Sequence, residues 1–171
     1  MSNMISQSLL PEFDMEMAST RKLLALVPES HLDFAPHPKS MTLSRLAGHV
    51  AEIPQWGVMT LGQDEFDMRP NGVAAFTAFT FTTQAAALTF FDEHLAQARG
   101  LLAGISDADM MRTWSLKDKG ATVLAMPKVA VMRSFVMNHM IHHRAQLGVY
   151  LRMNNVAIPG MYGPSADDAP M

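Results

Sequence analysis

The sequence predicts an all-α protein, a four-helix bundle with connections of unequal length. Four segments repeat apolar residues at steps of three and four, the spacing that places side chains on one face of a helix. Prolines and glycines lie between those segments, where helices should end. The 171 residues, 49% of them hydrophobic and 17% charged, suit one domain over residues 1–171 and are too few to expect two.

The first helical segment covers residues 5–27. Its regular part is expected to begin near Pro11, because proline is tolerated best in the first turn of a helix. Pro28 closes the helix. Residues 29–40 contain two further prolines and should form an ordered connection across the end of the bundle.

The second helix should run from a cap at Ser40 or Thr42 to about Gly62. Pro54 falls in its interior, where the ring removes one backbone hydrogen bond and forces a kink. One histidine lies within the apolar face of this helix rather than on its polar side. That face consists of Leu46, His49, Ile53, Trp56 and Thr60.

The middle of the chain alternates irregular and helical segments. Residues 63–81 form the longest irregular stretch, whose three phenylalanines we expect at the mouth of a pocket. Residues 83–102 predict the third helix, which ends at Gly104. Residues 106–126 look irregular, with a short hairpin turning at Lys119 and Gly120. The three loop phenylalanines are Phe76, Phe79 and Phe81.

The fourth helix is predicted from Pro127, as its first residue, to about Met153. It carries two apolar lines, and a helix with two such lines needs a second packing partner, either inside the chain or in another subunit. The first line comprises Met132, Val136, His139, His143, Gln146 and Tyr150. The second comprises Val131, Phe135, Ala145 and Val149. The tail after this helix is rich in proline and glycine and should be irregular.

Composition excludes several classes of function. The net charge of −3 and the scattered basic residues argue against nucleic-acid binding, which needs a basic face. We find no signal peptide and no apolar run long enough for a membrane, and we expect a cytoplasmic protein. The chain has no cysteine, so any metal site must use His, Asp or Glu. The 16 methionines are typical fillers of helical cores.

Histidines provide the candidate site. His139 and His143 are four residues apart, so they stack one turn above the other on a helix and can point at one metal ion. His49 lies on the core line of another helix. Three core imidazoles each need hydrogen-bonding partners, and one shared divalent cation would satisfy all three; the alternative is three separately hydrogen-bonded core histidines.

The other histidines fit the site less well. His142 competes with His143 because a spacing of three also suits ligands, but it lies on the second apolar line, where we expect it to support a ligand or an interface. His31 and His37 lie in a proline-containing connection, and His94 lies beside the apolar face of its helix. Solvated side chains are expected for these three.

A site with three neutral protein ligands leaves a coordination position open, which is typical of catalytic rather than structural metal sites. That position can take a water whose pKa falls toward ~7, or a substrate oxygen or sulfur. Glu52, one turn after His49, could act as a base or hold an imidazole; a solvated Glu is the plainer alternative. Asn138, Arg144 and Gln146 flank the ligand pair, and Gln146 is expected to point inward.

Three segments of the chain together resemble the DinB family of small bacterial proteins. They are MTLSRLAGHVAEIPQW, NHMIHHRAQLGVYLRM and IPGMYGPSADD. The resemblance implies a four-helix bundle in which three histidines bind a divalent metal, commonly zinc or nickel. It carries the ligands over to His49, His139 and His143, and it favours His143 over His142. Where the family often has Gly after the His-Arg pair, this chain has Ala145.

The resemblance also implies a homodimer and, in some relatives, a transferase or isomerase that uses low-molecular-weight thiols. We therefore expect a metal-dependent enzyme of transferase or hydrolase type that acts on a small molecule, with Glu52 as the candidate catalytic residue. The alternative is a non-catalytic helical module in which the metal ties two helices together. An apolar-ligand carrier is a third hypothesis, suggested by the methionines and the loop aromatics.

Overall fold

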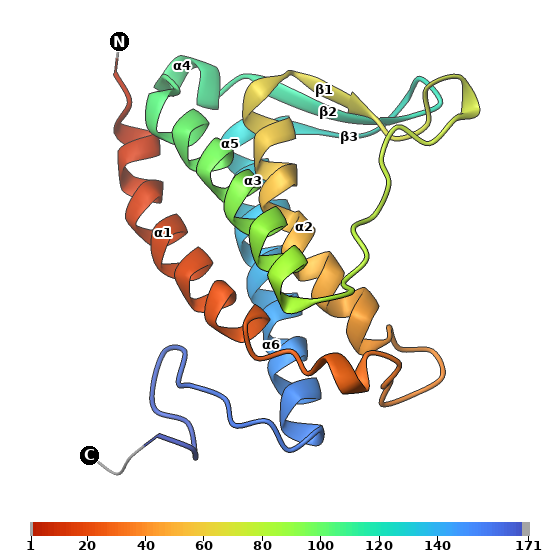
Figure 1. The fold of residues 1–171 in the computed structure, drawn as a ribbon. Helices are drawn as coiled ribbons and strands as arrows, with labels where there is room; N and C mark the ends of the chain where they lie inside the picture. The colour runs from red at the N-terminus through yellow and green to blue at the C-terminus, as the bar shows by residue number, and fades with distance from the viewer. Residues whose placement is uncertain (1, 169–171) are drawn as a thin grey trace.

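The computed structural model describes residues 2–168, and it is mostly helical with a small sheet at one end (Figure 1). The last of its four long helical segments is composite, because a π-helical stretch joins a short α-helix to a longer one. The long segments are α1 (Met4–Leu24), α2 (Leu43–Gly62), α3 (Gln84–Gly104), and α5 (Lys128–Val131) continued by the π-helical Met132–Asn138 and by α6 (His139–Met153).

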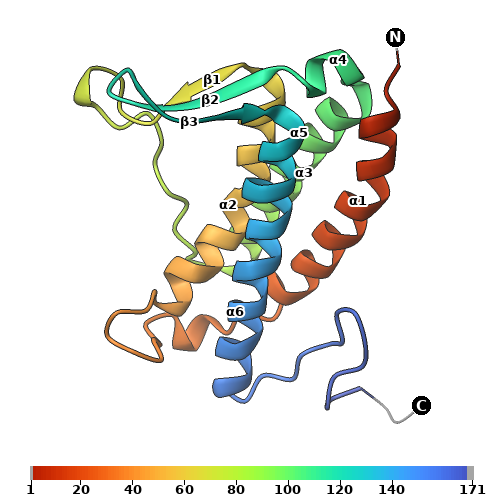
Figure 2. The same cartoon turned by 180° about the vertical axis from the view of Figure 1, so that it is seen from behind.

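The helices do not simply alternate in direction. Both α2 and α3 run toward the sheet, whereas α1 and α6 run away from it (Figures 1 and 2). The long connection from α2 to α3 makes this possible, because it returns along α2 to the far end of the bundle. The unequal connections predicted this: neighbours in sequence are not all antiparallel neighbours in space.

The all-α prediction was wrong in one respect, because the structure contains a three-stranded sheet. It consists of β1 (Glu65–Asp67), β2 (Thr113–Asp118) and β3 (Ala121–Pro127), in that spatial order. β2 and β3 form the expected hairpin, turning through Lys119 (φ 52°) and Gly120 (φ 81°). β1 pairs in parallel with β2 across a long stretch of sequence, and its three residues are too few to show a strand period.

The first helix begins earlier than Pro11. Pro11 is exposed within α1, whose first residue is Met4. The short helix α4 (Asp107–Met110) explains this start, because the Asp107 Oδ1 accepts the backbone N–H of Ile5 at 2.8 Å and so caps the helix from outside. The helix ends at Leu24, three residues before the predicted end.

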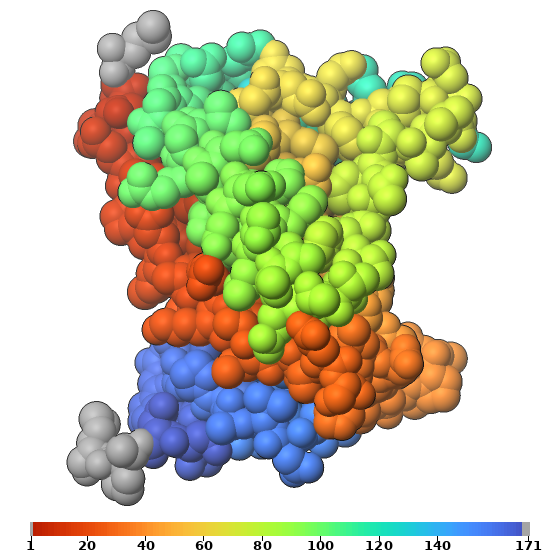
Figure 3. All heavy atoms as spheres, viewed as in Figure 1, coloured from red at the N-terminus to blue at the C-terminus, as the bar shows by residue number. Residues whose placement is uncertain are grey.

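The predicted start of α2 is confirmed, with Thr42 rather than Ser40 as the cap. Thr42 caps this helix by accepting the N–H of Arg45 at 3.2 Å. Pro54 is buried inside the same helix. At the end of the bundle opposite the sheet, residues 29–40 lie against the start of α3 (Figure 3). There the N–H of Gln84 donates to the Glu29 carboxylate at 2.8 Å.

The fourth helical segment differs most from prediction. Pro127 ends β3, so the helix starts at Lys128. The π-helical turns change the helical register, and Gln146, expected inside, is exposed. The buried residues of the π-helical stretch and α6 are Met132, Val136, Met137, Met140, Arg144, Leu147, Gly148, Tyr150 and Leu151. Among residues 2–168, no helix combines the length and apolar character needed to cross a membrane.

Candidate metal centre

Three histidines from two helices converge at one point. His49 comes from the middle of α2, and His139 and His143 from the first turns of α6. One ring nitrogen of each lies within 4.8 Å of the others. The Nε2 atoms of His49 and His139 are 2.9 Å apart. His49 is buried, with 6% of its surface exposed, and the other two are half-buried.

In two of the three rings, a hydrogen bond to Nδ1 determines that Nε2 is the nitrogen available to bind a metal ion. The Nδ1 of His49 lies 2.7 Å from Oε1 of Glu52, and the Nδ1 of His143 lies 2.8 Å from Oε1 of Gln146. Both oxygens accept, so each Nδ1 carries the hydrogen and each Nε2 keeps its lone pair. Each partner lies three residues after its histidine, on the same helix.

Glu52 is buried, with 1% of its surface exposed, so the solvated interpretation was wrong. Its Oε1 accepts from His49 and lies 3.4 Å from the guanidinium nitrogens of Arg45. Its Oε2 accepts the backbone N–H of Phe79 at 2.8 Å. Both oxygens are therefore occupied by protein donors, which is the arrangement of a residue that orients an imidazole.

The loop that reaches Glu52 depends on Gly48. A Cβ atom built at Gly48 would lie 2.4 Å from the carbonyl oxygen of Phe79. Only glycine at this position lets the backbone around Phe79 approach α2 closely enough to donate to Glu52. The connection between α2 and α3 thus has a direct part in holding His49.

The surroundings of His139 and His143 favour the neutral form of both rings. Burial, followed by the neighbouring His143 and His49, lowers the pKa of His139 from 6.5 to about 4. Burial also lowers the pKa of His143, against the opposing effect of its hydrogen bond to Gln146. Neutral imidazoles are the form that binds metal ions, so no proton has to leave these two rings at neutral pH.

The remaining histidines lie outside this cluster. His142 is exposed, and its ring centroid is 4.7 Å from that of His143. His31 and His37 are exposed as expected. The solvated interpretation of His94 was wrong, because this side chain is half-buried and its Nδ1 lies 2.8 Å from the carbonyl oxygen of Phe90, to which it donates.

An apolar cavity of about 390 Å³ lies beside the histidines. Trp56 joins the two, because it lines the cavity and its ring centroid lies 5.6 Å from that of His49 and 5.2 Å from that of His139. The cavity is bounded by α2, the sheet and the π-helical stretch. Of the three loop phenylalanines, only Phe76 lines it; Phe79 stacks on Phe90, and Phe81 is buried in the core.

Comparison with known proteins identifies the family. The model of the DinB family matches residues 1–170. The chain belongs to the DinB family. Two solved structures have a similar fold: a DinB-like protein from Bacillus cereus (20% identity, TM-score 0.66, covering 91% of this chain and 97% of that one) and a DinB-like protein from Bacillus subtilis (14% identity, TM-score 0.67, covering 90% and 96%). Curated proteins give no significant match.

The donor set of this DinB protein fits a divalent ion of borderline softness. Three imidazole nitrogens converge, two of them with their other ring nitrogen hydrogen-bonded to a side-chain oxygen. Metal-binding histidines usually show this pattern of outer hydrogen bonds. His49, His139 and His143 can therefore hold a metal ion.

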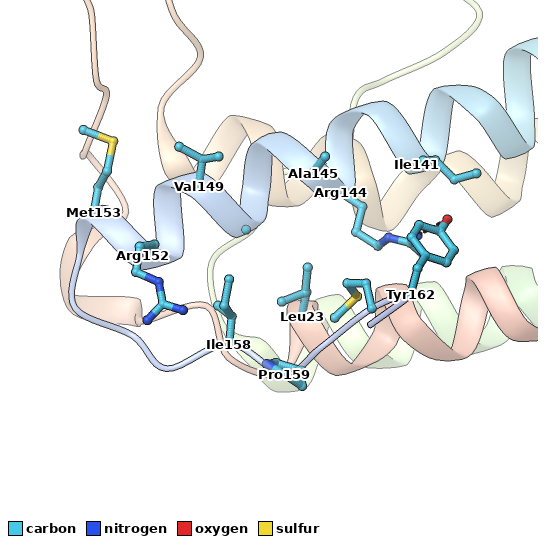
Figure 4. Close-up of a pocket in the computed structure, with 12 residues that line it drawn as sticks. Leu23, Ile141, Arg144, Ala145, Val149, Arg152, Met153, Ile158, Pro159 and Tyr162 are labelled. Atoms are coloured by element: carbon cyan, nitrogen blue, oxygen red, sulfur yellow. Dashed lines mark hydrogen bonds between the residues drawn. The ribbon is translucent and has the colours of Figure 1, made fainter. Parts of the chain in front are cut away.

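A second buried polar cluster was missed by sequence reasoning. Arg144 and Glu16 form an ion pair at 2.6 Å and are 2% and 3% exposed. The hydroxyl of Tyr162 bridges them, at 2.6 Å from Arg144 and 2.8 Å from Glu16, and ties the C-terminal segment to α1 and α6. Figure 4 shows Tyr162 beside Arg144 of α6. A cavity of about 440 Å³ lies under this segment, and no histidine lines it.

Proposed function

We propose that this DinB protein is a metal-dependent enzyme in which His49, His139 and His143 hold a zinc or nickel ion. The convergence of three ring nitrogens within 4.8 Å carries this proposal. A divalent ion held by three imidazoles supplies Lewis-acid activation of a water or a thiol at its remaining position, as a transferase or hydrolase requires.

The protein's own groups would position the reaction. Glu52 holds His49 with its Nε2 toward the other two rings, and Gln146 does the same for His143. Because Glu52 has both oxygens engaged, its proposed role is positioning rather than proton transfer. Trp56 packs edge-to-face against the rings of His49 and His139 and so restricts their movement. The substrate is a small molecule, and a low-molecular-weight thiol is the proposed second reactant.

Elemental analysis of protein purified without an affinity tag tests the metal. We expect close to one divalent ion per chain, and a fully folded, metal-free protein would contradict the proposal. Cobalt-loaded protein then tests the open position, because the visible spectrum of the ion should shift when a small thiol is added. The matched control is the His143→Ala variant, which should give neither full metal content nor the shift.

The structure also has a feature that favours a purely structural metal: the three histidines join α2 to α6. In that case the ion would mainly stabilise the bundle. Removing it would then lower the melting temperature strongly, and added thiol would leave the cobalt spectrum unchanged. A change in the cobalt spectrum on adding thiol would favour a catalytic metal site over a structural one.

We further propose a homodimer formed through α6. On this helix Val149 and Met153 are 58% and 53% exposed, and Ala145 is exposed as well. Exposed apolar side chains along one helix favour a second copy as the packing partner. Analytical ultracentrifugation should give the mass of two chains, and Val149→Glu should shift it to that of one.

A further inference from the structure

The cavity beside Trp56 is lined mainly by apolar side chains, many of them aromatic. Five of the residues around its 390 Å³ are aromatic, and they come from α2, the sheet, the long loop and the π-helical stretch. Aromatic walls favour flat aromatic ligands, which can stack or lie edge-to-face against them. The five aromatic residues are Trp56, Phe66, Phe76, Trp114 and Phe135.

Both tryptophans at this cavity have an unsatisfied hydrogen-bond donor. Among the residues that the structure describes, the buried side-chain polar atoms without a partner are Nε1 of Trp56 and Nε1 of Trp114. Indole N–H groups only donate, and buried donors in native proteins almost always have an acceptor. Both side chains that carry these donors line the same cavity, which points to a ligand with an acceptor group there.

The cavity is also placed to serve the histidines. Trp56 packs edge-to-face against the rings of His49 and His139 and also lines the cavity. A molecule in the cavity would therefore contact the same indole as two of the candidate metal ligands.

We propose that this cavity binds the flat aromatic part of a small-molecule substrate, with a carbonyl-type acceptor hydrogen-bonded to an indole N–H of Trp56 or Trp114. Because both nitrogens are buried, the ring that donates must rotate when the ligand binds. As a substrate site the proposal rests on the proposed metal-dependent activity; as a binding site it stands on the cavity alone.

Binding of 2-acetylnaphthalene to metal-free protein tests the site. Trp56 and Trp114 are the two tryptophans of the chain, so quenching of tryptophan fluorescence reports directly on the cavity. The matched ligand 2-ethylnaphthalene has the same shape without the carbonyl. We expect 2-acetylnaphthalene to bind about three- to tenfold more tightly than 2-ethylnaphthalene. This preference should disappear in one of the two variants Trp56→Phe and Trp114→Phe, the one that removes the donating N–H. Equal affinities in wild-type protein, or no binding, would overturn the proposal.

Leu124 and Val123 provide a matched pair of variants. Leu124 lines the cavity, whereas Val123, the preceding residue of β3, is 57% exposed and does not. Leu124→Phe should fill space and weaken 2-acetylnaphthalene binding about tenfold, and Val123→Phe should leave it unchanged. Equal effects would overturn the proposal. If Leu124→Phe does not fold, Phe76→Ala tests the same point. Phe76 is a half-buried loop residue that forms one aromatic wall of the cavity, and its removal should weaken 2-acetylnaphthalene binding several-fold.

The metal content of the same preparations separates this inference from the proposed function. Leu124→Phe should keep the metal stoichiometry of wild-type protein, because Leu124 is not among the three histidine ligands or their hydrogen-bond partners. If 2-acetylnaphthalene binds to a protein that takes up no metal, the proposed function fails and the binding site stands. If metal binds but 2-acetylnaphthalene does not, the cavity proposal alone is overturned.

Discussion

The Nδ1 of His49 and the Oε1 of Glu52 are 2.7 Å apart and almost fully buried. This contact turns the Nε2 of His49 toward His139 and His143. Because Oε2 of Glu52 accepts the N–H of Phe79, the orientation of His49 is coupled to the loop that precedes α3. The candidate metal centre therefore depends on α2, α6 and this loop together.

Replacing Glu52 with Gln should weaken metal binding about 10- to 100-fold. A glutamine side chain can accept from Nδ1 of His49 with its single oxygen, but its NH₂ group would then face the N–H of Phe79, a donor against a donor. Competition with a chromophoric chelator gives the affinity. Glu12→Gln, which breaks a surface ion pair with Arg133, is the matched control and should bind metal as wild type. Equal affinities in both variants would contradict the orienting role of Glu52.

Gly48→Ala should destabilise the protein and weaken metal binding together. The added Cβ would meet the Phe79 carbonyl at 2.4 Å, so the loop must move away from Glu52, at a cost of about 1–3 kcal/mol in the free energy of unfolding. Gly100→Ala is the matched helical control, because nothing lies within 4 Å of its Cβ. That variant should gain about 0.5–1 kcal/mol. Urea denaturation and metal titration measure both effects, and a stable Gly48→Ala variant with normal metal affinity would refute the close-approach argument.

The sequence was sufficient to predict features that depend on neighbouring residues. Helix periodicity located the four long helical segments, and the choice of Ser40 or Thr42 as a cap located the start of α2, where Thr42 is the cap in the structure. The stacking of His139 and His143 follows from helix geometry, and the place of His49 on an apolar face indicated the third member of the cluster. All of these are local properties of a helix.

The features that the sequence could not predict depend on contacts between distant segments. β1 exists because residues 65–67 meet β2, about fifty positions later. The burial of Arg144 requires Glu16, which lies 128 residues away. The π-helical turns before His139 add a residue to the repeat, so the buried face of the following helix moves by one position. A prediction from a constant helical period therefore put Gln146 inside. Charged residues are rarely fully buried unless paired, so neither Arg144 nor Glu16 could be assigned to the core alone.

Glu16→Gln should be one of the most destabilising single changes at a polar residue. It leaves the guanidinium of Arg144 buried without its countercharge, and removing one partner of a buried pair typically costs about 3–5 kcal/mol. Asp14→Asn, two residues earlier on α1, breaks an exposed pair with Arg99 and should cost less than about 1 kcal/mol. Urea denaturation of both variants gives the comparison. If both variants lose a similar free energy of unfolding, the buried pair contributes no more to stability than the surface pair.

The stability of the metal-free protein should fall as the pH is lowered from about 6.5 to about 4. In this window an unfolded His139 takes up a proton, whereas the folded side chain, with its pKa lowered to about 4 mainly by burial, stays neutral. The unfolded state then binds more protons, so the free energy of unfolding decreases with falling pH, and the full stability is present above the unfolded pKa. The lowered pKa of His143 acts in the same direction.

Urea denaturation across this pH range measures the slope of the free energy of unfolding against pH. This slope should be shallower for His139→Asn than for wild type, whereas His37→Asn, at an exposed position, should keep the wild-type slope. An unchanged slope in His139→Asn would mean that the histidine cluster does not hold this ring in its neutral form.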